Sequence, residues 1–188
     1  PSYRLLYDNE PRIENGRVVL PAEIGRGLAA FREAGFPAMA ARAEDGGLGL
    51  PRTFANAAFL QFQAANVSIA NYAMLSASAA ELLARHGTEA QKAHYMTPLL
   101  EGRFHGTMAL SEPQAGSSLG DITTSARARP DGTYALRGTK MWISGAEHDM
   151  AENIIHLMLA RIEGAPAGVR AAGETHSAAA GTEDPATS

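Results

Sequence analysis

The chain has 188 residues, of which 45% are apolar, and a formal net charge of −4. This length suffices for one domain with a sizeable core or for two small ones. The absence of a basic block argues against a nucleic-acid surface, and the absence of cysteine excludes disulfides, thiolate metal ligands and cysteine nucleophiles. No apolar run approaches transmembrane length and no signal-peptide pattern is present, so we expect a cytoplasmic protein without a membrane span.

The first third of the chain predicts one amphipathic helix after an irregular start. Residues 1–20 contain turn signals rather than a periodic apolar pattern. In residues 21–34, the apolar side chains Ile24, Leu28 and Phe31 recur at i, i+4 and i+7 and therefore share one helix face.

Further helices are expected up to residue 102. The glycine-rich residues 45–50 predict a loop, after which Thr53 is the expected cap of a second helix. An alanine-rich helix should then end near His86. Residues 88–91 have the Thr-to-Gln spacing of a capping box and so predict the start of another helix.

After residue 102 the apolar period changes from that of a helix to that of a strand. Residues 122–129 and 134–137 alternate as half-buried strands do, and Pro-Asp-Gly at 130–132 predicts the hairpin turn between them. The apolar run 153–161 predicts a more buried strand.

This change of period predicts an α+β chain with two domains. Residues 1–103 form the expected helical N-terminal domain, and residues 104–170 form the first part of an expected antiparallel β domain. Residues 171–188 lack hydrophobic periodicity and are rich in Ala, Gly, Thr and Ser, which is the composition of a disordered tail.

One segment of the β half has the residues of a ligand-binding loop. Residues 108–120 begin as an extended run and break at a Glu-Pro pair into a loop of small residues, where backbone N–H groups and hydroxyls can approach a flat or anionic ligand. An ordinary turn after a strand is the alternative interpretation. Residues 138–145, further downstream, contain the chain's one tryptophan, for which the residues alone favour a core position.

Together these segments resemble the acyl-CoA dehydrogenase family of flavoproteins. The resemblance rests on A-L-S-E-P-Q-A-G-S at 109–117, G-T-K-M-W-I-S-G at 138–145 and E-D-G-G-L-G-L-P at 44–51. The continuation from E-H-D at 147–149 to E-N-I-I-H at 152–156 is similar to the branch that contains 3-methylmercaptopropionyl-CoA dehydrogenase.

The resemblance implies an FAD-dependent enzyme that oxidises the Cα–Cβ bond of an acyl-CoA thioester to a trans-2-enoyl-CoA and passes the electrons to an electron-transfer flavoprotein. It also implies a helical domain followed by a β-barrel domain, a homo-oligomer in the complete enzyme, and a C-terminal helical domain that this chain lacks. It places Ser117 on the acyl-CoA side as well as beside the cofactor. The residues that it implies for FAD contact are Met108, Leu110, Ser111, Gly116, Ser117, Trp142, Ile143 and Ser144.

The chain departs from the family pattern at two places. The family's catalytic glutamate lies on the missing part, so no catalytic residue is assigned. The family loop has an aspartate where this chain has Ser118, and Asp121 follows three residues later. His148 and Asp149 are too few for a metal site, so no metal ligand is assigned either.

Two alternatives stay open: a non-catalytic α+β fragment that acts as a binding module, and an acyl-CoA oxidase-like flavoprotein.

Overall fold

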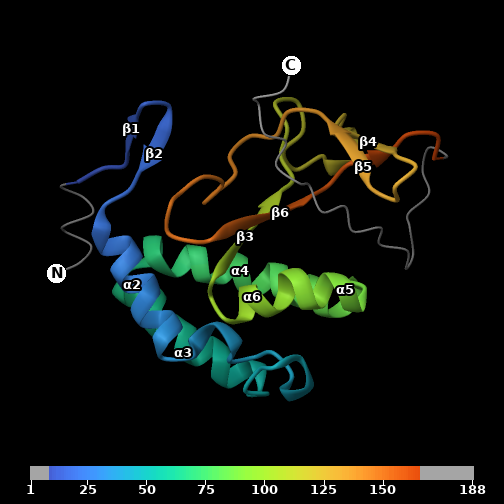
Figure 1. The fold of residues 1–188 in the computed structure, drawn as a ribbon. Coiled ribbons are helices and arrows are strands. Elements are labelled where there is room, and N and C mark those ends of the chain that lie inside the picture. Colours follow the sequence, from blue (N-terminus) through green and yellow to red (C-terminus); the bar gives the residue numbers. More distant parts are fainter. Residues whose placement is uncertain (1–8, 166–188) are drawn as a thin grey trace. The chain divides into compact units, whose positions relative to one another are not determined.

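The computed structural model describes residues 9–165, so the prediction for residues 171–188 lies outside the described part (Figure 1). The described residues divide into two compact units. The first contains the chain up to Thr107 together with Ser144–Ile155, and the second contains Met108–Ile143 together with the residues from His156 on. Helices precede the strands of the second unit, which confirms the predicted α+β class with a helical first part.

The first unit begins with a short hairpin. Strands β1 (Arg12–Glu14) and β2 (Arg17–Val19) pair in antiparallel register. The two turn residues, Asn15 and Gly16, have φ values of 53° and 76°. Asn-Gly with both residues at positive φ is the favoured two-residue hairpin turn. For residues 12–19 the expectation of an irregular start was therefore wrong, because turn chemistry defines this hairpin although its strands are too short to show alternation. Residues 1–8 lie outside the described part.

Helix α2 (Ala22–Glu33) buries the three apolar residues that its spacing predicted. One of them, Phe31, packs against the rings of Phe36 and Phe62 with centroid separations of 5.4 and 4.9 Å. Because these rings come from three different segments of the first unit, they form a core contact of the helical part.

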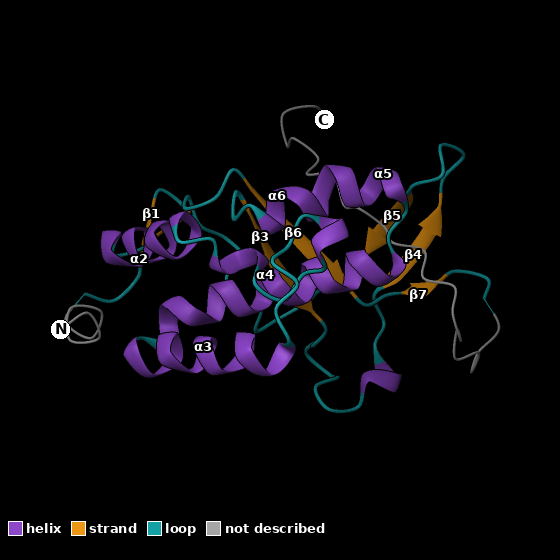
Figure 2. Cartoon of the chain, turned by 90° about the horizontal axis from the view of Figure 1, so that it is seen from below, coloured by secondary structure: helices purple, strands orange, loops and turns teal. Residues whose placement is uncertain are grey.

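Helices α3 (Arg52–Ala65) and α4 (Val67–His86) lie side by side in this unit (Figure 2). The residue before α3 is a proline and no side chain caps the helix, so the predicted cap at Thr53 was wrong. The side chain of Asn66 caps α4 instead, accepting a hydrogen bond from the N–H of Ile69 at 3.2 Å.

Helix α4 has the length and composition of a membrane-spanning helix, with 20 residues and a mean hydropathy of 1.2. The expectation that no segment reaches this length is corrected accordingly. A single helix of this kind is weak evidence for a span, because core helices of soluble proteins pass the same test. Ala79, Ala80 and Leu83 are buried inside the first unit, and 28% of the apolar window of α4 is buried.

The predicted capping box is confirmed at the start of α5 (Glu89–Gln91). Thr88 Oγ1 accepts from the N–H of Gln91 at 3.2 Å, and Gln91 Oε1 accepts from the N–H of Thr88 at 2.9 Å. A π-helical turn over Lys92–Met96 then leads into α6 (Thr97–Leu100).

Strand β3 (Phe104–Ala109) pairs with β6 (Asn153–Met158), and both strands pass from the first unit into the second. The second unit contains the three-stranded sheet of β5 (Tyr134–Arg137), β4 (Ser125–Ala128) and β7 (Arg161–Ile162), in that order. The pair of β4 and β5 is antiparallel as predicted, whereas β7 runs parallel to β4. Strand β4 begins at Ser125, whereas the alternation of residues 122–129 predicted a start at residue 122.

Candidate functional site

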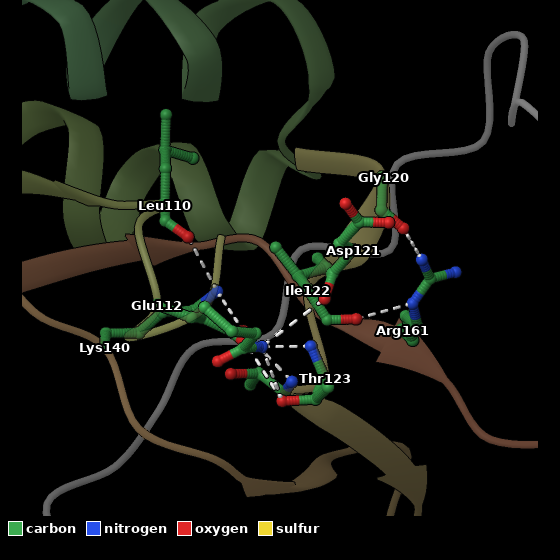
Figure 3. A network of polar contacts seen from close by, with 10 residues as sticks. Leu110, Glu112, Gly120, Asp121, Ile122, Thr123, Lys140 and Arg161 are labelled. Atoms are coloured by element: carbon green, nitrogen blue, oxygen red, sulfur yellow. Dashed lines mark hydrogen bonds and ion pairs between the residues drawn. The ribbon is translucent and has the colours of Figure 1, made fainter. Parts of the chain in front are cut away.

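A buried ion pair joins the two motif segments within the second unit (Figure 3). Lys140 Nζ lies 2.8 Å from Glu112 Oε1, and their side chains are only 6% and 1% exposed. The same ammonium donates a hydrogen bond to the carbonyl oxygen of Leu110 at 3.0 Å. One residue further along each segment, the N–H of Met141 donates to the carbonyl oxygen of Ser111 at 3.0 Å. The structure therefore brings residues 110–112 and 140–141 side by side.

The Glu112 carboxylate accepts further hydrogen bonds on both oxygens. Oε1 accepts from the N–H of Thr124 at 3.0 Å, and Oε2 accepts from the N–H of Thr123 at 2.7 Å, its hydroxyl at 2.8 Å and Gln114 Nε2 at 2.8 Å. Burial alone would raise the pKa of Glu112, but the hydrogen bonds from Lys140, Thr124 and Thr123 lower this pKa well below its usual range. A buried ion pair is maintained where its remaining lone pairs are satisfied in this way.

Arg161 fixes the loop that follows Glu112. Its Nε donates to the carbonyl oxygen of Ile122 at 2.7 Å, and its Nη2 donates to that of Gly120 (Figure 3). The short 3₁₀ turn Leu119–Asp121 is therefore tied to strand β7. Asp121 is exposed, and its carbonyl oxygen accepts a hydrogen bond from Gln114 Nε2 at 3.4 Å. Within residues 9–165 its carboxylate forms no hydrogen bond or ion pair with the Glu112 network.

Trp142 is an exposed residue with a left-handed backbone. Its φ is 62° and 84% of its surface is exposed. The core position that we kept as the alternative for this tryptophan is contradicted, and residues 138–143 lie outside strands. A bulky side chain at positive φ is a backbone outlier, and such strain accumulates at functional sites.

The other residues implied for FAD contact are distributed over three segments. Met108 lies near the end of β3, with Leu110 and Ser111 just beyond it, and all three are half-buried. Gly116 and Ser117 are exposed, and among the described residues no hydrogen bond links them to residues 140–143. Half-buried Ile143 directly follows Trp142, and exposed Ser144 belongs to the first unit.

A separate polar cluster lies in the first unit. His105 Nδ1 and His148 Nε2 are 3.3 Å apart, and the ring of Tyr72 meets the His148 ring edge to face at 5.3 Å. Burial, with smaller effects of His148 and Arg32, lowers the pKa of His105 to about 4. The N–H of Met150 donates to His148 Nδ1 at 3.2 Å, so the proton of neutral His148 is on Nε2 and points at His105. Within residues 9–165 no three His, Asp or Glu side chains converge on a metal position.

Sequence reasoning missed Glu112 and Lys140 as site residues. Both residues lie in the motifs that carry the family resemblance, but no role was assigned to either of them. The signal was present: one acid and one base stand among small and apolar residues, in two segments that were expected to serve one site. Such a pair is expected to be buried only when each charge has a partner.

Comparison with known proteins identifies the two parts of the chain. The profile of the acyl-CoA dehydrogenase N-terminal domain matches residues 9–103, and the profile of the acyl-CoA dehydrogenase middle domain matches residues 107–176. The chain belongs to the acyl-CoA dehydrogenase family. The resemblance on which the sequence analysis relied is thereby confirmed.

Individual members of the acyl-CoA dehydrogenase family match most of this chain. The 3-methylmercaptopropionyl-CoA dehydrogenase of Ruegeria pomeroyi is 45% identical over 159 residues, which are 85% of this chain and 27% of that protein. The broad-specificity linear acyl-CoA dehydrogenase FadE5 of Mycobacterium tuberculosis is 36% identical over 154 residues, 81% of this chain and 25% of that protein. The chain thus spans about a quarter of the length of these relatives.

Solved structures agree with this assignment. An acyl-CoA dehydrogenase from Bacillus anthracis, crystallised with FAD, has a TM-score of 0.63 and 28% identity over 75% of this chain and 24% of that one. The butyryl-CoA dehydrogenase of Megasphaera elsdenii has a TM-score of 0.59 and 28% identity over 71% of this chain and 34% of that one.

Proposed function

We propose that this chain forms the flavin-facing part of an FAD-dependent acyl-CoA dehydrogenase that converts an acyl-CoA thioester into a trans-2-enoyl-CoA. The observation that carries this proposal is Trp142, a large apolar residue that is 84% exposed on a strained backbone, two positions after Lys140 of the buried ion pair. An exposed aromatic ring held in this way provides a flat surface for another flat ring.

The residues around Trp142 fit a flavin, which has a flat apolar face and a polar edge. Within residues 9–165 nothing accepts a hydrogen bond from the N–H or the hydroxyl of Ser111, so both groups are available as donors. Ser111 is linked to the tryptophan segment by the hydrogen bond from Met141. The Trp142 ring can therefore pack on the apolar face of a flavin, and the Ser111 donors can bind its polar edge.

In this proposal, FAD supplies the hydride acceptor of the reaction when it is bound. Trp142 packs near the isoalloxazine ring, and Ser111 donates hydrogen bonds to the polar edge. Ser144 carries a further hydroxyl for flavin N5. Gly116 and Ser117 serve the pyrophosphate and the acyl-CoA. No glutamate among the 188 residues matches the family's catalytic position, so proton abstraction is assigned to the remainder of the parent enzyme.

Substrate and partners are proposed from the relatives. The similarity to 3-methylmercaptopropionyl-CoA dehydrogenase supports an acyl-CoA substrate, and the similarity to FadE5 supports the same class. We propose an electron-transfer flavoprotein as the acceptor and a homo-oligomer as the state of the complete enzyme. The cytoplasmic location stays a prediction.

The visible spectrum of the purified chain tests the cofactor assignment. The chain is incubated with FAD and separated from free cofactor by rapid gel filtration, with FMN in a parallel sample. We expect flavin bands to elute with the protein after FAD incubation. A colourless protein fraction would contradict the proposal and favour the non-catalytic binding module.

A further inference from the structure

The carbonyl oxygens of Leu110 and Ser111 are both occupied by the 140–141 segment. Lys140 Nζ donates to the first at 3.0 Å, and the N–H of Met141 donates to the second at 3.0 Å. In a trans peptide the C=O and the following N–H point in opposite directions. The Leu110 carbonyl turned toward Lys140 therefore directs the N–H of Ser111 away from the ion pair.

That N–H has no acceptor among residues 9–165, and Ser111 as a residue is half-buried. A backbone donor without a partner in the protein needs a ligand or water as its acceptor. The next N–H, on Glu112, is already used because it donates to the carbonyl of Ala115 at 2.9 Å. Ser111 is thus the donor that this arrangement leaves available.

The ion pair also determines where the tryptophan segment lies. Lys140 lies two residues before Trp142 and is almost fully buried. Its ammonium donates to the Leu110 carbonyl and to the Glu112 carboxylate, and these two contacts hold residue 140 in place. Glu112 is held in turn by the N–H groups of Thr123 and Thr124. An exposed bulky residue at positive φ persists only where the surrounding structure fixes its backbone.

We propose that Glu112 and Lys140 are positioning residues of the flavin site, a role that rests on the proposed function. By holding the Leu110 carbonyl and the 140–141 backbone, the pair presents the Ser111 N–H and the Trp142 ring to the cofactor. Neither Glu112 nor Lys140 touches the flavin in this account.

The test combines amide hydrogen exchange by NMR with the fluorescence anisotropy of Trp142, in the 188-residue chain without FAD. Lys140→Met keeps the apolar stem and removes the ammonium. Lys92→Met is the matched control, since Lys92 forms an ion pair with the exposed Glu89. Gln114→Ala is the control within the network, because it removes one donor to Glu112 and leaves the ion pair.

In Lys140→Met we expect the Met141 amide to exchange roughly tenfold faster, the factor that corresponds to one net hydrogen bond. The Trp142 anisotropy should fall as well. Both controls should stay within about twofold of wild type. Unchanged exchange of the Met141 amide in Lys140→Met would overturn the proposal. An equally large rise in Met141 exchange in Gln114→Ala would overturn it too, because it would indicate general damage to the network.

Amide exchange of the wild-type chain with and without FAD is a second test, which remains available if Lys140→Met does not fold. Met141 should be protected and Ser111 unprotected without FAD, and added FAD should slow the exchange of Ser111. A fast-exchanging Met141 amide would overturn the positioning role. If Met141 is protected but FAD leaves Ser111 unchanged, the proposed function fails while the hydrogen bond between Met141 and Ser111 stands.

Discussion

Trp142 is the residue at which strain and exposure coincide. A left-handed backbone costs a non-glycine residue roughly 1–2 kcal/mol, and a ring that is 84% exposed gains little from burial. The buried Glu112–Lys140 pair fixes the backbone just before it, so this conformation can be maintained. A tryptophan held in this way is better explained by ligand contact than by folding stability.

Substituting Trp142 should separate these two roles. Trp142→Phe keeps an aromatic ring, so FAD binding should weaken by about three- to twelvefold, the equivalent of a stacking energy of about 0.5–1.5 kcal/mol. Trp142→Ala should weaken it further because it removes the whole ring. Since the ring is exposed, the unfolding free energy of the FAD-free chain should change by no more than about 0.5 kcal/mol. Equilibrium FAD titration and urea unfolding measure the two effects.

Phe54 provides the matched control for these variants, because it is another exposed aromatic residue and lies in the first unit. Phe54→Ala should leave FAD affinity unchanged. The flavin assignment of Trp142 fails if Trp142→Ala binds FAD as tightly as Phe54→Ala does, or if it unfolds at much lower urea than the parent chain.

The folded chain should become less stable as the pH falls, because burial lowers the pKa of His105. Its folded pKa is about 4, against 6.5 ordinarily, as a result of burial and its neighbours His148 and Arg32. Between these two values the unfolded chain binds more protons, so the folded state loses stability as pH falls from about 6.5 to about 4. The full loss from this group is about 3 kcal/mol. Tyr72 also faces the pair but stays neutral in this range, since burial raises its pKa.

Urea unfolding of the parent chain and His105→Asn at several pH values measures this effect. The difference between the two curves isolates His105 from the carboxylates that titrate nearby. The variant should lose less stability between pH 6.5 and 4 than the parent, and His86→Asn, at an exposed position, should follow the parent. Identical pH dependence of parent and His105→Asn would show that His105 does not titrate with folding.

At the level of elements, β3 packs on α4 through Gly106. A Cβ built at this glycine would lie 2.5 Å from the Cβ of Ala79 and 3.2 Å from the carbonyl oxygen of Leu75. The N–H of Gly106 also donates to Ser76 Oγ at 3.1 Å. Strand and helix backbone are therefore as close as a glycine allows.

Gly106→Ala should destabilise the chain by about 1–3 kcal/mol, because Ala79 and the helix carbonyl cannot rotate away from the added methyl group. Thermal unfolding followed by circular dichroism measures this loss. Gly120→Ala is the control, since nothing lies within 4 Å of the added group there and its φ is not positive. Equal melting temperatures of the two variants would mean that strand and helix are not packed this closely.

Local periodicity predicted those elements whose pattern is strong. The apolar spacing of residues 21–34 and the Thr-to-Gln spacing of the capping box correspond to α2 and α5. The hairpin after Glu14 was missed, because three-residue strands are too short to alternate. The parallel pairing of β7 with β4 was missed too, since register between distant segments depends on contacts such as that of Arg161 with Ile122.

The site was predictable as a pair of segments but not as an arrangement. The family motifs indicated which stretches meet, and the structure shows them joined at Ser111 and Met141. The left-handed backbone of Trp142 could not be read from the sequence, because a bulky aromatic residue rarely adopts it. The donors to Glu112 from Thr123 and Thr124 depend on backbone N–H groups, whose directions only the fold determines.

At the scale of the whole molecule, the chain corresponds to the first two domains of its relatives and to about a quarter of their length. Without a glutamate at the family's catalytic position, the 188-residue chain should not oxidise acyl-CoA. General bases contribute typically about 10²–10⁴-fold to rate. Dye reduction with octanoyl-CoA and added FAD measures this, with a complete relative as positive control. Turnover near roughly one per second, an ordinary enzymatic rate, would refute this prediction.

The emission of Trp142 during FAD titration reports on the proposed flavin site without any substitution, because this is the chain's only tryptophan and it would lie against the bound ring. Spectra are corrected for absorption by FAD, and free N-acetyltryptophanamide is titrated in parallel to measure collisional quenching. We expect saturable quenching in the chain and none beyond the collisional level in the control. Quenching of the chain that merely follows the control, at every FAD concentration, would contradict the flavin site proposed here.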